Sequence, residues 1–196
     1  MSQAALRITS TDAGMLISAE EFASGTFEEP YIYERVKGRL VVMSPAGPEH
    51  RRVSRAFRRE LGGYWHAHVD LVEEVDVEGW VATSPDDDRI PDICVYLIGE
   101  SSGQTVPRRV PELIFEFVSK DRSDQERDYI DRRKEYFDLG VKEYVIVNRF
   151  KQSVLVLTLK PGETDYHERL LHSDQQYSSP LLSGLVVALS EVFAKD

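Results

Sequence analysis

Residues 112–119, with the sequence Glu-Leu-Ile-Phe-Glu-Phe-Val-Ser, constrain the fold of this chain more than any other segment. A short run rich in aromatic and aliphatic residues is typical of a buried strand. Because successive side chains on a strand point to opposite faces, Leu113, Phe115 and Phe117 share one face and Ile114 lies on the other. The run therefore predicts a central strand with apolar neighbours on both faces.

Glu116 interrupts the apolar row that it shares with Ile114 and Val118. Burying an unpaired carboxylate costs several kcal/mol or forces it to protonate, so such a residue normally faces a cation, a metal ion or a hydrogen-bond network. The sequence leaves two main alternatives open. Glu116 is either a metal ligand or a structural carboxylate paired with Arg132 or Arg133.

Residues 90–98 predict a second strand, in which Pro91 is tolerated because it stands at the start. Asp92 begins this strand. Two carboxylates on near-adjacent buried strands, followed by cations on a covering helix, suit a hard divalent ion such as Mg²⁺. Asp92 and Glu116 meet that requirement, although Asp92 alone could equally be structural and accept a hydrogen bond from a loop amide.

The best-signalled helix has Ser123 as its N-cap, Glu126 at the third helical position and Gly140 as its stop. At about 100° per residue, Arg132 and Lys134 fall on the two borders of the apolar arc. The arc itself contains Tyr129, Ile130, Arg133, Tyr136 and Phe137. The opposite face contains Asp128, Asp131, Glu135 and Asp138. We therefore expect one face of this helix to pack on the sheet.

Other elements follow from local patterns. Ser18 and Glu21 form a capping box that predicts a short helix from residue 19. Lys37-Gly38 predicts the turn of a hairpin. The remaining expectations are hairpin strands at 31–36 and 39–43, a helix from 49 to a stop at Gly62-Gly63, strands within 69–83, a loop at 84–89, strands at 143–147 and 153–159, and a short closing helix within 177–193.

The bulk properties favour a single domain. The chain has 196 residues, of which 41% are hydrophobic, and this is enough for one sizeable core. Neither a signal peptide nor a run of roughly 20 apolar residues that could span a membrane is visible. The single cysteine, Cys94, excludes an intramolecular disulfide and a thiolate zinc cage. We expect a cytoplasmic protein with no membrane partner.

The net charge of −10 argues against a broad phosphate-binding surface. Residues 51–59, however, contain five arginines and no acidic residue. They form either a solvated helix face or a local basic patch.

Several short motifs occur together in order: Ile90-Pro-Asp92, Glu116-Phe-Val-Ser119, Arg127-Asp-Tyr129, Glu135-Tyr136 and Gly140-Val-Lys-Glu-Tyr144. With this order and spacing, the chain resembles the Uma-two family of proposed restriction endonucleases, a branch of the PD-(D/E)XK nuclease fold. The resemblance runs from about residue 16 to about residue 193.

The resemblance implies an α/β fold, with a mixed sheet flanked by helices. It implies one restriction-endonuclease-like domain over 16–196 after an N-terminal extension at 1–15. By the same resemblance Asp92 and Glu116 hold Mg²⁺ or Mn²⁺, and the reaction is hydrolysis of DNA phosphodiesters. A homodimer is expected by analogy, because cutting both strands takes two sites.

The chain departs from the family pattern at one important position. The lysine usually found two residues after the strand glutamate is Val118 here, and the lysine that this family takes from the following helix is replaced by Arg132. An arginine can clamp a phosphate, but its pKa above about 12 excludes proton transfer at neutral pH. Lys134 is the other candidate for this role. Glu34 and His50 are possible additional site residues.

Three functions remain open from the sequence. The first is a Mg²⁺-dependent DNA endonuclease with Arg132 or Lys134 stabilising the transition state. In this hypothesis Arg51, Arg55 and Arg58 contact the DNA backbone. The second is a catalytically degenerate nuclease fold that binds nucleic acid or a protein partner without cleavage. The third, a purely structural dimerisation domain, leaves Glu116 unexplained.

Overall fold

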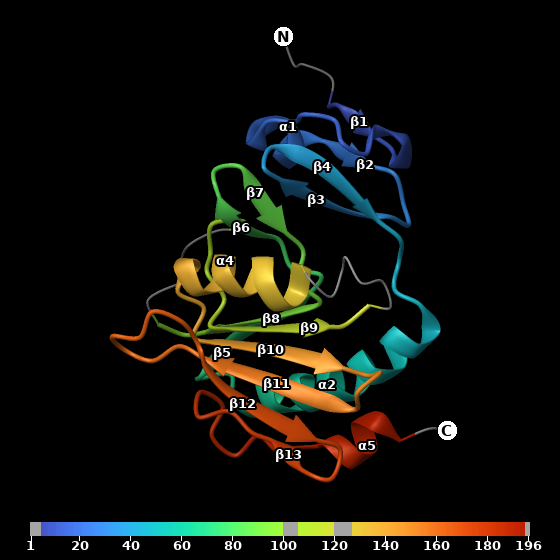
Figure 1. Cartoon of the computed structure of the whole chain (residues 1–196). Coiled ribbons are helices and arrows are strands. Elements are labelled where there is room, and N and C mark those ends of the chain that lie inside the picture. The colour runs from blue at the N-terminus through green and yellow to red at the C-terminus, as the bar shows by residue number, and fades with distance from the viewer. Residues whose placement is uncertain (1–4, 100–105, 120–126, 195–196) are drawn as a thin grey trace.

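A six-stranded mixed sheet forms the centre of the molecule (Figure 1). The computed structural model describes residues 5–99, 106–119 and 127–194. Across the sheet the strands are β12 (His167–His172), β11 (Ser153–Thr158), β10 (Glu143–Asn148), β9 (Leu113–Phe117), β8 (Ile93–Leu97) and β5 (Val72–Val77). Only β9 and β10 run parallel, and the other neighbours are antiparallel. The expected mixed α/β fold is confirmed.

Helices cover both faces of this sheet. The helices α2 (Pro48–Ala67) and α5 (Leu189–Phe193) lie on one face, and α4 (Arg132–Leu139) lies on the other (Figure 1). Phe115 packs in the core on the α2 side, whereas Ile114 packs with Tyr136 on the α4 side. The alternation predicted along residues 112–119 is therefore confirmed.

A second, smaller sheet stands over the α4 side of the large one (Figure 1). Its strands are, in spatial order, β4 (Arg39–Met43), β3 (Ile32–Val36), β7 (Asp87–Arg89) and β6 (Val81–Ser84). The other elements are β1 (Arg7–Ile8), a 3-10 turn at Ser10–Asp12, α1 (Ala19–Ser24), β2 (Thr26–Phe27), β13 (Gln176–Tyr177) and β14 (Val187–Ala188). No helix within these described ranges is long and apolar enough to cross a membrane.

Two local predictions near the N-terminus are confirmed. The capping box forms as expected, because the Glu21 amide donates to Ser18 Oγ over 3.2 Å and the Ser18 amide donates to Glu21 Oε2 over 2.9 Å. In the hairpin turn Lys37 and Gly38 have φ angles of 51° and 71°, so lysine shares the left-handed conformation with the expected glycine. This hairpin carries Glu34 on β3.

The prediction that Gly62-Gly63 ends its helix is wrong. The helix α2 continues to Ala67, and Leu61 and Tyr64 on either side of the glycines are both buried. The Tyr64 hydroxyl also donates to the Ser183 carbonyl over 3.0 Å. Packing of these residues outweighs the cost of a glycine in a helix, which is about 1 kcal/mol.

The loop predicted at 84–89 also differs, because Asp87–Arg89 pair with β3 and β6 as the short strand β7. Strand β12 was not predicted. It lies at the edge of the sheet, five of its six residues are exposed, and its sequence therefore lacks an apolar alternation. In both cases backbone pairing with neighbouring strands of the sheet decides the conformation.

The predicted phase of the helix ending at Gly140 holds along α4, where Tyr136 is buried and Asp138 is exposed, but it is wrong at residues 128 and 130 in the turn before α4. Asp128, expected on the solvent face, is only 4% exposed, whereas Ile130, expected in the apolar arc, is 64% exposed. A π-helical turn at Arg127–Asp131 precedes α4 and changes the angular spacing on which the prediction relied. Gly140, with a φ of 88°, ends the helix as predicted. Ser123 and Glu126 lie outside the described residues.

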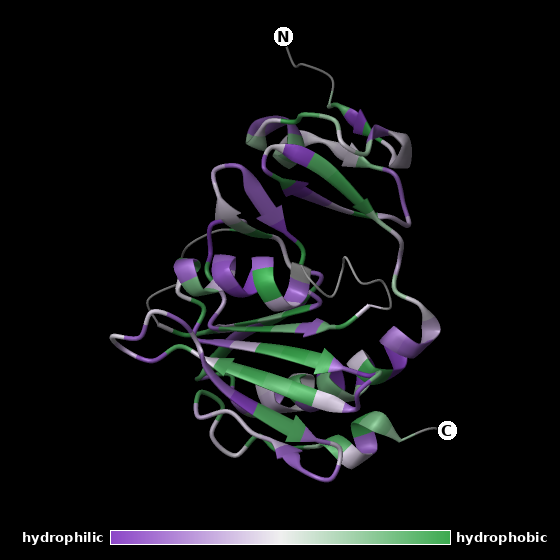
Figure 2. Ribbon diagram, in the orientation of Figure 1, coloured by the Kyte–Doolittle hydropathy of each residue, from purple (hydrophilic) through white to green (hydrophobic). Residues whose placement is uncertain are grey.

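Figure 2 shows a contrast between α4 and the sheet beneath it. Strands β10 and β11 are largely hydrophobic, whereas α4 is largely hydrophilic. Yet Arg132 and Tyr136 of this helix are buried. A helix that turns polar side chains toward a sheet must find charged or hydrogen-bonding partners there.

Candidate active site

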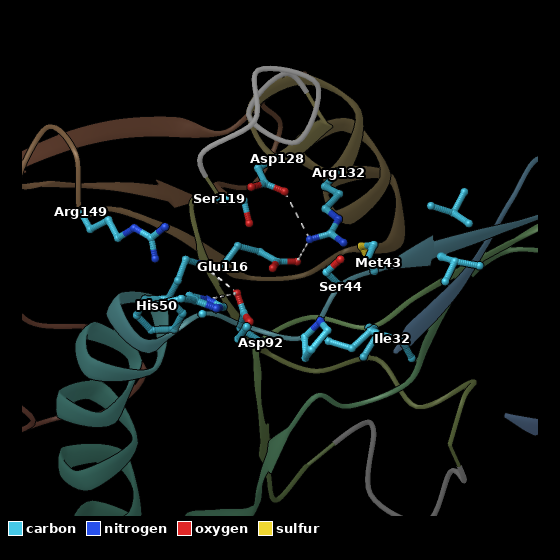
Figure 3. Close-up of a pocket in the computed structure, with 17 residues that line it drawn as sticks. Ile32, Met43, Ser44, His50, Asp92, Glu116, Ser119, Asp128, Arg132 and Arg149 are labelled. Carbon is cyan, nitrogen blue, oxygen red and sulfur yellow. Dashed lines mark hydrogen bonds and ion pairs between the residues drawn. The ribbon is translucent and has the colours of Figure 1, made fainter. Parts of the chain in front are cut away.

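A pocket of about 580 Å³ lies where the two sheets meet. One part of its wall comes from β4, the loop that follows β4 and the first turn of α2 (Figure 3). The other part comes from the residues just before β8, the end of β9, the helical segment at 127–139 and the residue after β10. Its charged and polar lining residues are Ser44, His50, Asp92, Glu116, Ser119, Asp128, Arg132 and Arg149.

Asp92 and Glu116 meet in this pocket because of the sheet register. Cys94 pairs with Ile114 and Ile93 with Phe115, and Asp92 directly precedes β8, beside the end of β9 that carries Glu116. Asp92 Oδ2 accepts a hydrogen bond of 2.8 Å from the Phe117 amide, which fixes its carboxylate. A hydrogen bond from a backbone amide, as expected for a structural Asp92, is thus present, although the donor lies in β9 and not in a loop. The Asp92 side chain still faces the pocket (Figure 3).

His50 joins Asp92 from the first turn of α2. Its Nε2 atom lies 3.3 Å from Asp92 Oδ2, and its ring packs 5.7 Å from the Phe117 ring, centroid to centroid. The structure therefore brings three of the sequence-predicted residues, His50, Asp92 and Glu116, to one wall of the pocket (Figure 3).

Arg132 lies at the centre of a buried ionic cluster. Its Nη1 atom donates to Glu116 Oε1 and lies 3.3 Å from Asp128 Oδ1, while Nη2 donates to Glu34 Oε1. The Tyr136 hydroxyl adds a 3.3 Å hydrogen bond to Glu116 Oε1. We refer to Glu34, Glu116, Asp128 and Arg132 as the Arg132 cluster. The ion pair between Glu116 and Arg132, one of the two sequence alternatives, is present.

Residues in and next to the small sheet bind Glu34, the member of the Arg132 cluster that lies on β3, through a hydrogen bond and a further ion pair. Glu34 Oε1 accepts from the Ile90 amide over 3.0 Å, and Arg89 Nη1 lies 3.5 Å from Glu34 Oε2. Arg89 Nε in turn donates to Glu135 Oε2 over 2.7 Å. These contacts tie β3 and β7 to α4, so that the second sheet positions the pocket.

The charges in the pocket do not balance. Four carboxylates, those of Glu34, Asp92, Glu116 and Asp128, stand against the guanidinium groups of Arg132 and Arg149 and that of Arg89, which lies beside Glu34 but also pairs with Glu135. Burial raises the pKa of Glu116 well above its usual value; Arg132 opposes this, and Asp92 and the other carboxylates add to it. A site that destabilises its own ionised carboxylate in this way favours an additional cation.

Arg132 remains charged in this setting. Burial by itself lowers the pKa of the guanidinium, but the carboxylates of Glu116 and Glu34 outweigh burial and raise it well above its usual value. Arg132 therefore cannot exchange a proton at neutral pH. Its two Nη atoms are occupied by carboxylates, which suits a residue that positions Glu116.

The structure does not bring Lys134 to the pocket. Its side chain is 76% exposed, and its Nζ atom pairs with Asp138 one turn along the helix. Because α4 turns Arg132 inward, the neighbouring position at 134 faces away from the sheet.

Lys134→Ala is therefore expected to leave the protein nearly unchanged. Exposed ion pairs one helical turn apart contribute about 0.3–0.5 kcal/mol, so the free energy of unfolding in urea should fall by no more than this. Any nuclease activity should keep its wild-type rate. A loss of nuclease activity in Lys134→Ala without a loss of stability would contradict this prediction and show that Lys134 contributes to the site.

The three arginines predicted to contact DNA lie along α2, outside the pocket lining. Arg51 donates a hydrogen bond to the carbonyl of Ala46, a residue of the loop that lines the pocket. Of the three arginines, Arg51 is thus the one that donates a hydrogen bond to a pocket-lining residue within the described ranges. Arg55 is exposed and Arg58 is half-buried further along the helix. They stay predictions as DNA contacts.

Sequence reasoning missed two charged residues of the pocket, Asp128 and Arg149. The four-residue spacing between Asp128 and Arg132 was a usable signal, since such residues are neighbours on a helix. Arg149 follows β10, and no local pattern distinguishes it from an ordinary turn residue.

Asp92 and Glu116 could hold a divalent ion between them. Asp92 Oδ1 and Glu116 Oε2 accept no hydrogen bond from the described residues, whereas the other oxygen of each is engaged. The described ranges contain no group of three or more His, Cys, Asp or Glu side chains able to hold a metal. Mg²⁺ needs only one or two protein carboxylates and takes water and phosphate oxygens for the rest, so this pair fits.

Comparison with known proteins agrees with the fold. The structure is similar to a crystal structure described as a putative nuclease belonging to DUF820 from Anabaena variabilis, with a TM-score of 0.71 and 17% sequence identity. The match covers 90% of this chain and 97% of the Anabaena chain. The comparison with curated proteins returned no match. Residues 19–190 match the model of the Uma2 family, described as "Putative restriction endonuclease". The chain therefore belongs to the Uma2 family.

Proposed function

We propose that this protein is a metal-dependent endonuclease that hydrolyses phosphodiester bonds of DNA in the pocket described above. The observation that carries the proposal is the pair Asp92 and Glu116. Asp92 directly precedes β8, Glu116 lies on the adjacent strand β9, and both line the pocket. Each has one oxygen without a hydrogen bond from the described residues, and the surrounding charge is in acidic excess. Membership of a family of proposed restriction endonucleases supports DNA as the substrate.

In this proposal Asp92 and Glu116 hold Mg²⁺ or Mn²⁺. The chemistry that such an ion supplies is polarisation of a phosphoryl oxygen and a lowered pKa for a bound water. His50 and the Phe117 amide hold Asp92 in place through its Oδ2 atom. Arg132 and Tyr136 do the same for Glu116 through its Oε1 atom. Arg132 is thus a positioning residue.

The wider surface fits a nucleic acid at one place. Arg51 borders the pocket through the loop at Ala46, and the other two predicted contacts, Arg55 and Arg58, follow on the same helix. These arginines would meet phosphates that flank the cleaved bond. Cleavage of both strands takes two copies of the site, so we also propose a homodimer.

Incubation with supercoiled plasmid tests this function. Nicked circles should accumulate with Mg²⁺ or Mn²⁺ and should be absent with excess chelator. Calorimetric titration with Mn²⁺ in the absence of DNA should show binding at millimolar metal or below. Nicking that survives chelation, or no heat with millimolar Mn²⁺, would contradict a metal site at Asp92 and Glu116.

A second candidate function is favoured by Arg132. An arginine replaces the lysine expected from the family pattern, and its charge is already shared among three carboxylates. Such a site could have lost cleavage and kept binding. DNA binding by the wild-type protein, without nicking at any Mg²⁺ or Mn²⁺ concentration, would select this alternative.

A further inference from the structure

Arg149 is a cation in the pocket for which neither the sequence nor the proposed chemistry gave a role. It follows β10 directly and lines the same pocket as Asp92 and Glu116. In Figure 3 its guanidinium points toward Glu116 from the side opposite Arg132. The acidic pair is therefore flanked by two arginines, one saturated by carboxylates and one not.

The loop that carries Arg149 is held by its neighbour. Asn148 is buried, and its Oδ1 atom accepts hydrogen bonds of 3.0 Å from the amides of Phe150 and Lys151. Its Nδ2 atom donates to the Tyr129 hydroxyl over 3.0 Å. The guanidinium of Arg149 lies 4.6 Å above the Phe150 ring. These contacts fix the backbone at Arg149 and direct its side chain.

Arg149 has no anionic partner among the described residues. Arginines that are more deeply buried all have one: Arg35 pairs with Asp88, Arg89 with Glu135, Arg109 with Glu73 and Arg132 with Glu116. Arg149 makes no ion pair within the described ranges, and its Nη1 atom is buried without a hydrogen-bond partner. Glu49, whose charge acts on Arg149 through space, pairs with Arg52 instead.

A half-buried guanidinium without an anion is an unfavourable arrangement. Burial lowers the pKa of Arg149, but an arginine in a protein stays protonated, so the charge persists and requires a partner. The planar guanidinium matches two oxygens of a phosphate, and such charge-assisted pairs are among the strongest hydrogen bonds. A phosphate group entering this pocket would supply the missing partner.

The first turn of α2 favours an anion at the same place. Ala46, Gly47 and His50 line the pocket, and the N-cap position at Gly47 has no side chain to accept from the first-turn amides. These amides carry the positive end of the helix dipole. A phosphate approaching Asp92 and Glu116 is repelled by their carboxylates, and Arg149 together with this helix end offsets part of that repulsion.

We propose that Arg149 is a phosphate-binding residue of this site, which contacts the backbone of the bound DNA strand beside Asp92 and Glu116. The inference rests on the proposed function and adds to it the group that holds the substrate phosphate. Because phosphate contacts carry no sequence information, the contact acts on every DNA sequence alike.

The experiment measures binding rather than cleavage. A fluorescein-labelled DNA duplex is titrated with protein in Ca²⁺, which replaces Mg²⁺ so that the DNA is not cut, and anisotropy is recorded over a series of salt concentrations. Arg149→Ala should weaken binding roughly tenfold, the loss expected for one charge-assisted contact. The slope of log affinity against log salt should become shallower by about 0.9, the value for one lost phosphate contact.

Two further variants separate this role from a structural one. Arg149→Lys keeps the charge and should restore the salt slope while recovering only part of the affinity. Arg169→Ala removes an exposed arginine of β12, at the far edge of the sheet, and should change neither quantity. Urea denaturation of each variant checks that the fold is intact.

The outcomes distinguish this inference from the proposed function. If the wild-type protein binds DNA and Arg149→Ala binds with the same affinity and salt slope, the inference is wrong and the proposed function stands. If the wild-type protein binds no DNA in Ca²⁺, both are wrong. A shallower slope for Arg149→Ala, restored by Arg149→Lys, supports the inference.

Discussion

Glu116→Gln is expected to abolish Mg²⁺-dependent plasmid nicking while leaving the folded protein at least as stable as the wild type. Glutamine keeps the shape of the side chain and can still accept a hydrogen bond from Arg132, but it removes the charge that would hold the metal. Loss of one of two carboxylate ligands should lower the rate at least about a hundredfold. The measurement is the initial rate of nicking at saturating Mg²⁺.

The stability half of this prediction follows from the pKa of Glu116. Burial raises this pKa, so the folded state binds the proton more tightly than the unfolded state. The resulting stabilisation is complete below the unfolded pKa of about 4.3 and is lost as the pH rises through the folded pKa. Glu116→Gln does not titrate here, so its stability advantage over the wild type should grow as the pH rises above about 4.3.

Binding of Mg²⁺ should reduce or reverse the stability advantage of Glu116→Gln over the wild type. Mg²⁺ stabilises the ionised carboxylate, so it should raise the melting temperature of the wild type at pH 8 and leave that of Glu116→Gln unchanged. Asp92→Asn should lose nicking in the same way. Glu168→Gln, at an exposed glutamate outside the pocket, serves as the control and should behave like the wild type. If both Glu116→Gln and Asp92→Asn nick plasmid at the wild-type rate, the proposed metal site at Asp92 and Glu116 is wrong.

The second large effect is expected at Arg132, and it concerns stability. Arg132→Met keeps the length of the side chain but leaves Glu34, Glu116 and Asp128 facing one another without their shared cation. Removing one partner of a buried ionic cluster costs about 3–5 kcal/mol. Urea denaturation at neutral pH should show this loss, and it should shrink at acidic pH because the carboxylates then take up protons.

The adjacent position provides a matched control. Arg133 pairs with Asp165 and Glu168, whose side chains are 60% and 51% exposed, so Arg133→Met should cost no more than about 1 kcal/mol. A double variant with Arg132→Met and Glu116→Gln should recover part of the lost stability, because one of the three carboxylates that lost the Arg132 guanidinium no longer carries a charge. Equal stability of Arg132→Met and the wild type would show that Arg132 does not hold the carboxylates together.

Arg132→Lys addresses the departure from the family pattern. Lysine keeps the charge but cannot span Glu34 and Glu116 with a planar fork, so we expect intermediate stability. A large gain in nicking would mean that arginine impairs the natural site. A loss would mean that holding two carboxylates at once matters more than the identity of the cation.

Local physics accounts for the parts of the fold that were predicted correctly. Alternation along residues 112–119 placed Phe115 and Glu116 on opposite faces. The strand predicted at 90–98 forms as β8 over the shorter range Ile93–Leu97, so that Asp92 lies directly before it. The capping box at Ser18 and the glycine stop at Gly140 depend on contacts within a few residues. Such signals survive in the folded protein because their partners are close in sequence.

The incorrect predictions share a different cause. Gly62-Gly63 was expected to end a helix that core packing continues, and Asp128 was placed in solvent although a π-helical turn directs it inward. Strand β12 has a mostly polar sequence and is held by pairing with β11. In each case a contact made elsewhere in the fold outweighed a local preference of about 1 kcal/mol or less.

The sequence alone predicts two carboxylates, Asp92 and Glu116, on near-adjacent buried strands, with a metal ion or an arginine facing Glu116, because strand alternation and the cost of burying charge are local and general. Only the tertiary structure decided which cation it is. Arg132 reaches Glu116 and also Glu34, which is 98 residues away along the chain, while Arg149 stands on the other side without an anion. Charge partners are chosen by proximity in space, and proximity over such separations is decided by the packing of the whole fold.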